Sequence, residues 1–186
     1  MKEKMTGLFL ILTLVFSGCA TQSNLTKEER ATRKAQEDAQ KQRMYESALS
    51  ALNNREFVLE ADRLYSRRGR TAYVTSTTNF IMVNGNRATV QIAFNNTVRP
   101  GPNGIGGITV EGLVSNVQTK TSKKGNIDYS FSVQGTGISA QVNISMAAGS
   151  DYATVTVNPN FSGNRFTMYG RIVPLEYSSV YKARPL

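Results

Sequence analysis

The sequence predicts an all-β domain, an antiparallel up-and-down barrel of about eight strands, preceded by an N-terminal helix. From residue 57 onward, apolar residues alternate with Ser, Thr, Asn or Gln over short runs, which is typical of strands with one buried and one solvated face. These runs follow one another closely and are joined mostly by hairpin turns. Local connections and an even number of strands favour a barrel over a Greek-key sandwich.

The chain begins with the parts of an export signal. Lys2 and Lys4 form a basic start, and the apolar run Leu8–Phe16 follows. This run is far shorter than the ~20 residues of a membrane-spanning helix. Its ending, Phe16-Ser17-Gly18-Cys19, resembles the lipobox of bacterial lipoproteins, whose cysteine is lipidated and becomes the new N-terminus. We therefore expect residues 1–18 to be a lipoprotein signal peptide and Cys19 to carry the lipid.

Residues 19–55 are expected to form the lipidated cysteine, a tether and a helical stalk. Thr26-Lys27-Glu28-Glu29 has the pattern of a capping box, and Lys27–Asn53 is rich in good helix formers. Two pairs with i,i+4 spacing are expected to support the helix: Glu29 with Arg33 and Glu37 with Lys41. Large apolar residues occur only in the second half, which we expect to pack on the domain: Met44, Tyr45, Ala48, Leu49 and Leu52.

Residues 56–186 are expected to form the barrel. Strands are predicted at Phe57–Asp62, Phe80–Val83, Arg87–Phe94, Ile108–Val114 with a possible extension to Thr121, Ile127–Val133, Ile138–Met146, Ala153–Val157 and Phe166–Ile172, and Thr71–Thr75 is expected to be extended as well. Asn84-Gly85 predicts a type I′ hairpin turn. Four aromatic residues fall on inward positions: Phe94, Tyr129, Phe131 and Phe166. They either line a cavity for one small ligand or fill the interior, since an eight-stranded barrel allows both.

Composition excludes several classes of chemistry. The chain contains no His, and its single cysteine is Cys19, so His-based triads, Cys–His nucleophiles and His/Cys sites for zinc, copper or haem are excluded. We predict no enzymatic activity, no cofactor and no metal. The net charge of +9 suits anionic partners. An exported, anchored protein has little access to nucleic acid, so anionic lipid and envelope polysaccharide remain as the candidate partners.

Several separate strings resemble one family of proteins. They are Asn79-Phe80-Ile81, Arg87-Ala88-Thr89-Val90-Gln91, Gly106-Gly107-Ile108-Thr109-Val110-Glu111-Gly112, Lys123-Lys124-Gly125-Asn126, Pro159-Asn160-Phe161 and Ser178-Ser179-Val180-Tyr181-Lys182. Together they resemble domain-of-unknown-function family 4251, lipoproteins typical of gut Bacteroidetes. The resemblance covers about Leu49–Leu186. It implies a lipocalin-like barrel on a lipid-anchored precursor, and it implies no activity.

Three sets of residues are candidates for binding. Arg67, Arg68 and Arg70 lie at one predicted turn, and Lys123 and Lys124 lie at another. If the two turns share an end of the barrel, these five residues would form one basic patch that could bind an anionic surface. Glu111 is an acid within an otherwise apolar strand. The loop Arg99–Gly107 is long and rich in Gly and Pro, as ligand-facing loops often are.

The hypothesis that follows is a lipid-anchored protein of the cell envelope, in the outer membrane and facing the periplasm. Its role would be non-enzymatic binding or structural, with a small apolar or amphipathic ligand in the barrel. The alternative is docking to an anionic polysaccharide or membrane surface through the basic turns, which would weaken with added salt. The lipid on Cys19 would be its contact with the membrane.

Overall fold

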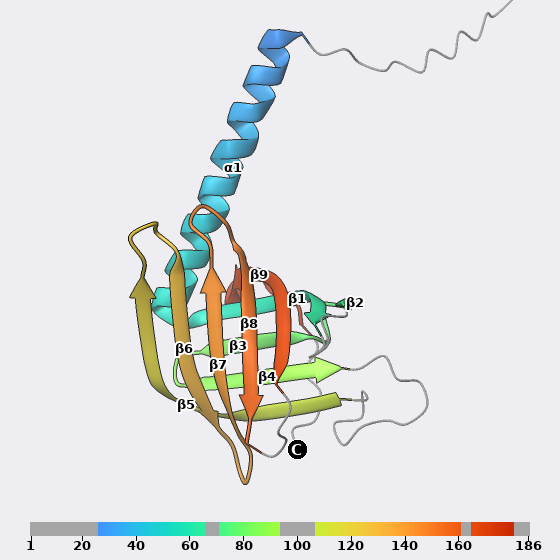
Figure 1. Ribbon diagram of the computed structural model, residues 1–186, viewed down its shortest axis with the longest axis vertical. Coiled ribbons are helices and arrows are strands. Elements are labelled where there is room, and N and C mark those ends of the chain that lie inside the picture. Colours follow the sequence, from blue (N-terminus) through green and yellow to red (C-terminus); the bar gives the residue numbers. More distant parts are fainter. Residues whose placement is uncertain (1–25, 66–70, 94–106, 161–164, 181–186) are drawn as a thin grey trace, which may run out of the picture.

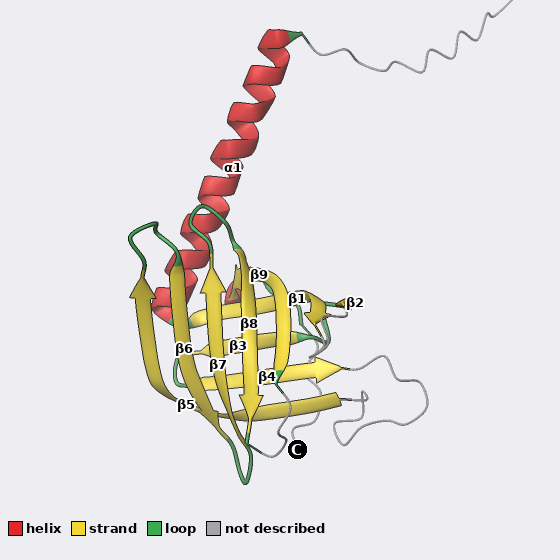
Figure 2. Ribbon diagram, viewed as in Figure 1, coloured by secondary structure: helices red, strands yellow, loops and turns green. Residues whose placement is uncertain are grey.

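A computed structural model describes residues 26–65, 71–93, 107–160 and 165–180, and it confirms the predicted fold class. One helix stands on the end of a closed antiparallel barrel (Figures 1 and 2). The elements are α1 (Lys27–Asn54), β1 (Glu56–Tyr65), β2 (Thr71–Tyr73), β3 (Phe80–Asn84), β4 (Arg87–Ala93), β5 (Gly107–Thr121), β6 (Ile127–Gln134), β7 (Ser139–Met146), β8 (Tyr152–Pro159), β9 (Phe166–Pro174) and the 3₁₀-helix η1 (Leu175–Tyr177).

Eight of these strands, all except β2, form the barrel, and each pairs with the next barrel strand along the chain. β1 pairs with β3, the order runs on from β3 to β9, and pairing of β1 with β9 closes the ring. The short strand β2 continues the line of β3, because Arg63–Tyr65 of β1 pairs with β2 and Glu56–Glu60 pairs with β3. The predicted extension of β5 to Thr121 is confirmed.

The seam between β1 and β9 requires a glycine. The register shifts between Ala61 and Arg63, and Gly170 lies opposite Ala61. A methyl group on Gly170 would overlap the backbone carbonyl oxygen of Glu60. The two backbones therefore approach more closely here than any residue with a Cβ atom permits.

Side chains fill the described interior of the barrel. Inward residues of all eight barrel strands belong to one core, and those that are buried expose at most 9% of their surface. The rings of Phe57 and Tyr129 pack edge to face with their centroids 5.8 Å apart, and the rings of Tyr129 and Phe131 pack edge to face at the same centroid separation. Of the four predicted inward aromatics, Tyr129 and Phe131 are buried, Phe166 is partly buried, and Phe94 lies outside the described residues. Among these side chains, the structure favours a filled interior over a ligand cavity.

The second half of α1 covers one end of the barrel. Ala48, Ala51 and Leu52 are buried within the barrel core, and Tyr45 and Leu49 pack against it. The preceding residues of the helix, 27 to 43, are all exposed, and in Figure 1 this part projects away from the barrel. The prediction that only the second half packs is confirmed. Neither helix in the described ranges combines the length and apolar character that crossing a bilayer requires.

The helix begins at the predicted capping box. The Glu29 amide donates to Thr26 Oγ1 at 3.2 Å, and the Thr26 amide donates to Glu29 Oε2 at 2.8 Å. Both predicted i,i+4 pairs are wrong. Glu29 is engaged in the capping box, and Arg33 pairs instead with Glu37, at 3.0 Å, so Glu37 does not pair with Lys41. Arg55 ends the helix in a left-handed conformation, with its amide bonded to the carbonyls of Ala51 and Leu52.

The turn between β3 and β4 differs from the prediction. Asn84 pairs with Arg87, so the two loop residues are Gly85 and Asn86. A type I′ turn needs positive φ at both loop residues, but only Gly85, at 60°, has it. The turn has the type II′ pattern instead, in which glycine occupies the first loop position.

Candidate functional site

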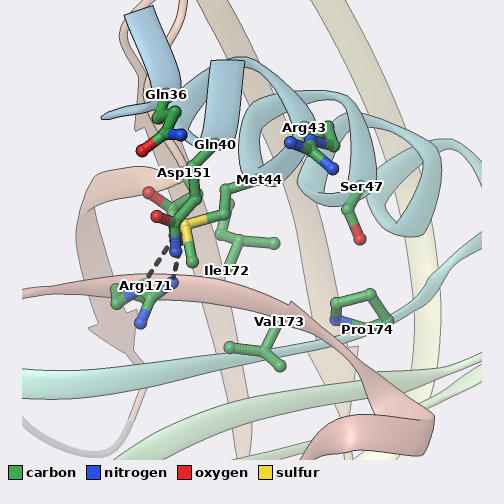
Figure 3. Close-up of a pocket in the computed structure, with 10 residues that line it drawn as sticks. All are labelled: Gln36, Gln40, Arg43, Met44, Ser47, Asp151, Arg171, Ile172, Val173 and Pro174. Carbon is green, nitrogen blue, oxygen red and sulfur yellow. Dashed lines mark hydrogen bonds and ion pairs between the residues drawn. The ribbon is translucent and has the colours of Figure 1, made fainter. Parts of the chain in front are cut away.

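An open groove lies between α1 and the barrel (Figure 3). It has a volume of about 540 Å³ and is bounded by the exposed side of the helix, the end of β9 and the turn before β8. The residues that line it are Gln36, Gln40, Arg43, Met44, Ser47, Asp151, Arg171, Ile172, Val173 and Pro174. We call this space the helix–barrel groove.

The helix contributes one wall of the helix–barrel groove. Gln36, Gln40, Arg43 and Ser47 recur at intervals of three or four residues, so they share one face of α1. Gln36, Gln40 and Arg43 are exposed, whereas Ser47 is half-buried nearer the barrel. This wall therefore presents two amides, a hydroxyl group and a guanidinium group.

The floor of the helix–barrel groove is apolar. Ile172, Val173 and Pro174 form the last residues of β9, and Met44 adds its thioether side chain from the helix. Val173, Pro174 and Met44 are half-buried, which leaves apolar surface available to a ligand. An apolar floor with a few polar groups at its edge is the usual character of a small-molecule site.

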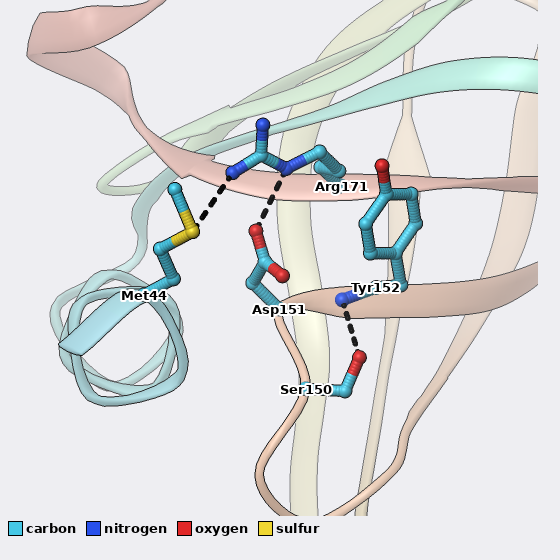
Figure 4. Close-up of polar contacts among 5 residues, drawn as sticks. All are labelled: Met44, Ser150, Asp151, Tyr152 and Arg171. Atoms are coloured by element: carbon cyan, nitrogen blue, oxygen red, sulfur yellow. Dashed lines mark hydrogen bonds and ion pairs between the residues drawn. The ribbon is translucent and has the colours of Figure 1, made fainter. Parts of the chain in front are cut away.

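An ion pair closes one end of the helix–barrel groove (Figure 4). Arg171 donates from Nε to Asp151 Oδ2 at 2.8 Å and from Nη2 to Met44 Sδ at 3.4 Å. The hydrogen bond to Asp151 is the main reason that the pKa of Arg171 lies above its ordinary value. The contact with Met44 joins the helix to the barrel, and the pair itself carries no net charge.

A column of cations and rings continues from this ion pair along the outer surface of the barrel. The guanidinium carbon of Arg171 lies 5.7 Å from the centroid of the Tyr152 ring, and that of Arg63 lies 4.3 Å from the centroid of the Tyr169 ring. The two tyrosine rings stack with their centroids 5.4 Å apart. Such cation–π contacts contribute about 0.5–1 kcal/mol each at exposed sites. Because both rings are occupied on their faces, the column serves to hold β1, β9 and β8 together rather than to stack a ligand.

Arg43 is the second cationic side chain that lines the helix–barrel groove, and unlike Arg171 it is not neutralised by any described carboxylate. Its Nε donates to the backbone carbonyl of Ala39 at 3.3 Å, and it pairs with no carboxylate in the part of the chain that the structure describes. The terminal nitrogens of its guanidinium group can therefore bind a carboxylate, sulfonate or phosphate.

Comparison with protein families finds one match, over residues 39–172, to a model described as domain of unknown function DUF4251. The chain belongs to the DUF4251 family. The match includes the packed half of α1 and runs to Ile172 in β9, so most of the helix–barrel groove lies within it. The chain is also similar to a crystal structure of a DUF4251 family protein from Bacteroides eggerthii. The two are 53% identical, with 76% of this chain and 94% of the other covered and a TM-score of 0.68. A comparison with curated proteins finds no match.

Of the predicted site residues of this DUF4251 protein, the three that the structure describes, Glu111, Lys123 and Lys124, do not line the helix–barrel groove. Lys123 and Lys124 are exposed in the turn between β5 and β6, beside α1, where Tyr45 Oη donates to the Gly125 carbonyl at 3.4 Å. Glu111 lies on β5, ten residues before the end of that strand, and forms an ion pair of 3.4 Å with Arg87 on β4. The structure therefore does not bring Glu111 and these lysines together.

The other predicted residues fall outside the described part of the chain. These are Cys19, Arg67, Arg68, Arg70 and residues 99–106 of the predicted loop. The last residue of that loop, Gly107, is described and begins β5. Within the described ranges, no group of three or more His, Cys, Asp or Glu side chains could hold a metal ion.

Sequence reasoning missed the residues of the helix–barrel groove. The spacing of Gln36, Gln40, Arg43 and Ser47 was a usable signal, because it marks a polar face that continues beside the packed half of the helix. Asp151 and Arg171 carried no such signal, since twenty residues separate them and only the pairing of β8 with β9 brings them together.

Proposed function

We propose that this DUF4251 protein is a lipid-anchored, non-enzymatic binding module of the cell envelope, and that its ligand occupies the helix–barrel groove. The ligand would be a small amphipathic molecule with an apolar body and an anionic group. The unpaired guanidinium group of Arg43 above the apolar end of β9 carries this proposal. The absence of His and of any cysteine beyond Cys19 supports a role without catalysis.

The filled interior supports the groove over the barrel as the site. Tyr129 and Phe131 occupy inward positions where a lipocalin-like ligand would have to lie, and both are buried among core side chains. The groove, by contrast, is already open and needs no rearrangement of the core. Pre-formed sites of this kind avoid the free-energy cost of opening a packed interior.

Isothermal titration with anilinonaphthalene sulfonate tests the proposal, because this probe joins an apolar ring system to one anionic group. The Cys19→Ala chain, which keeps the remaining sequence and lacks the lipid, is the protein to use. We expect one site. Arg43→Gln should weaken binding about tenfold, as expected for loss of a charge-assisted hydrogen bond worth about 1.4 kcal/mol. Lys41→Gln is the matched control, since Lys41 is exposed on the same helix and does not line the groove.

A second variant tests the place of binding independently of charge. Ser47→Trp should fill the groove and abolish binding while leaving the far-ultraviolet circular dichroism spectrum unchanged. Equal affinities in the unsubstituted, Arg43→Gln and Ser47→Trp proteins would overturn the proposal.

Docking to an anionic polysaccharide remains the second candidate. Lys123 and Lys124 are exposed on one turn, and neither forms an ion pair with a carboxylate among the described residues. Docking to the protein's own membrane is less well supported. The exposed part of α1, residues 27 to 43, spans about 25 Å, several times the Debye length of about 8 Å at physiological salt. Binding to a soluble anionic polysaccharide that is unchanged in Lys123→Glu/Lys124→Glu would exclude this candidate.

A further inference from the structure

A second depression continues the helix–barrel groove along α1. It has a volume of about 320 Å³ and is lined by Ser47, Ser50, Ala51, Asn54, Glu56, Pro174, Leu175, Glu176 and Tyr177. Ser47 and Pro174 line both spaces, so the two adjoin at these residues. We call the combined space the furrow.

The furrow follows one face of the helix. Its polar residues on α1 recur at intervals of three or four: Gln36, Gln40, Arg43, Ser47, Ser50 and Asn54. Eighteen residues separate the first from the last, which corresponds to about 27 Å along the helix axis. The opposite wall follows the chain from Arg171 at the end of β9 into Tyr177 of η1. The furrow is therefore elongated along the helix.

The two halves of the furrow differ in charge. Arg43 supplies the uncompensated cation in the half of the furrow that begins at Gln36, because Arg171 in that half is neutralised by Asp151. In the other half, Glu56 and Glu176 are exposed, and neither forms an ion pair within the described ranges. The C-terminus of α1 adds partial negative charge there, and no basic residue lies in the last turn. Arg55, which caps the helix, does not line the furrow.

We infer that the ligand is a short extended peptide with free termini, an inference that rests on the proposed function and specifies its ligand. The terminal carboxylate binds Arg43, and the terminal ammonium group lies between Glu56 and Glu176. The side chains of Ser47, Ser50 and Asn54 can form hydrogen bonds to peptide amides. The apolar groups of Val173, Pro174 and Tyr177 contact apolar side chains of the peptide. Arg43 and Asn54 are eleven residues apart, which is about 17 Å along the helix, and an extended chain advances about 3.4 Å per residue, so about five peptide residues match this distance.

Equilibrium dialysis of the Cys19→Ala chain against a mixture of random five-residue peptides tests this inference, with retained peptides quantified by mass spectrometry. Three forms of the mixture are compared: free termini, acetylated N-termini and amidated C-termini. Blocking either terminus should lower retention at least fivefold. Arg43→Gln should remove only the preference for a free carboxylate. Glu56→Gln/Glu176→Gln should remove only the preference for a free amine, and Lys41→Gln should preserve both.

The outcomes separate this inference from the function on which it rests. Equal retention of free and blocked peptides would overturn the peptide assignment. If anilinonaphthalene sulfonate still bound in an Arg43-dependent way, the groove would keep its proposed function with a different ligand class. Loss of both signals would overturn both.

Discussion

The Nε atom of Arg171 on β9 lies 2.8 Å from Oδ2 of Asp151, in the turn before β8, and Nη2 of the same guanidinium group reaches Met44 on α1. The backbones of β9 and this turn are joined here as well, since the Ile172 amide donates to the Asp151 carbonyl at 2.8 Å. A single side chain thus joins the helix, β8 and β9 at the rim of the candidate site.

Asp151→Asn should lower the free energy of unfolding by about 1 kcal/mol. The substitution removes the anionic partner of Arg171, but that side chain is 40% exposed, so water compensates part of the loss. Urea denaturation measures the effect. Arg33→Gln is the matched control, because it breaks the exposed pair with Glu37 and should change stability by less than about 0.5 kcal/mol. Equal effects of the two substitutions would contradict the role given to Asp151.

Tyr129→Phe should stabilise the protein, by about 1 kcal/mol. The Tyr129 hydroxyl is buried and finds no hydrogen-bond partner in the structure, and an unsatisfied buried polar group is costly. Phenylalanine keeps the edge-to-face contacts with Phe57 and Phe131. A loss of stability in urea denaturation at neutral pH would show that the hydroxyl has a partner in solution.

The same residue predicts a dependence on alkaline pH. Burial raises the pKa of Tyr129 above its ordinary value of 10.0. As pH rises above that value, the unfolded chain loses this proton before the folded protein does. The folded state then binds more protons than the unfolded state, so its stability falls with rising pH. The fall between pH 8 and pH 11 should be smaller in Tyr129→Phe, and equal slopes for the two proteins would contradict this.

Gly170→Ala should destabilise the protein by at least about 3 kcal/mol or prevent folding, because its methyl group would overlap the carbonyl of Glu60 at the β1–β9 seam. Gly149→Ala is the control. Gly149 has a φ of 72° and no atom within 4 Å of the position that a methyl group would take, so only the left-handed backbone opposes alanine there, at about 1 kcal/mol. Thermal unfolding followed by circular dichroism distinguishes the two, and similar melting temperatures would argue against a close approach at the seam.

Cys19→Ala should abolish incorporation of labelled fatty acid and release the protein from the membrane fraction. The lipobox resemblance of Phe16-Ser17-Gly18-Cys19 motivates this prediction. Stable anchoring requires more than one acyl chain, so partial labelling should give partial membrane association. Ser17→Ala retains a small residue before the cysteine and serves as the control. A Cys19→Ala protein that still sediments with membranes would contradict lipidation at this position.

Much of the barrel could be predicted because its signal is local. In β6, for example, Ile127, Tyr129 and Phe131 alternate with polar residues, and this alternation alone determines which side chains face inward. The capping box at Thr26 is equally local, since both hydrogen bonds form within four residues. Neither pattern depends on contacts with distant parts of the chain.

Local patterns of residues thus specify the strand faces, the start of the helix and the half of the helix that packs. The closure of the barrel, with Phe57 of β1 opposite Pro174 of β9, emerges only in three dimensions, because register across a seam depends on backbone approach and not on composition. The helix–barrel groove arises in the same way. Arg43 and Arg171 lie in segments far apart in the chain, and the docking of α1 on the barrel end alone makes them neighbours across one site.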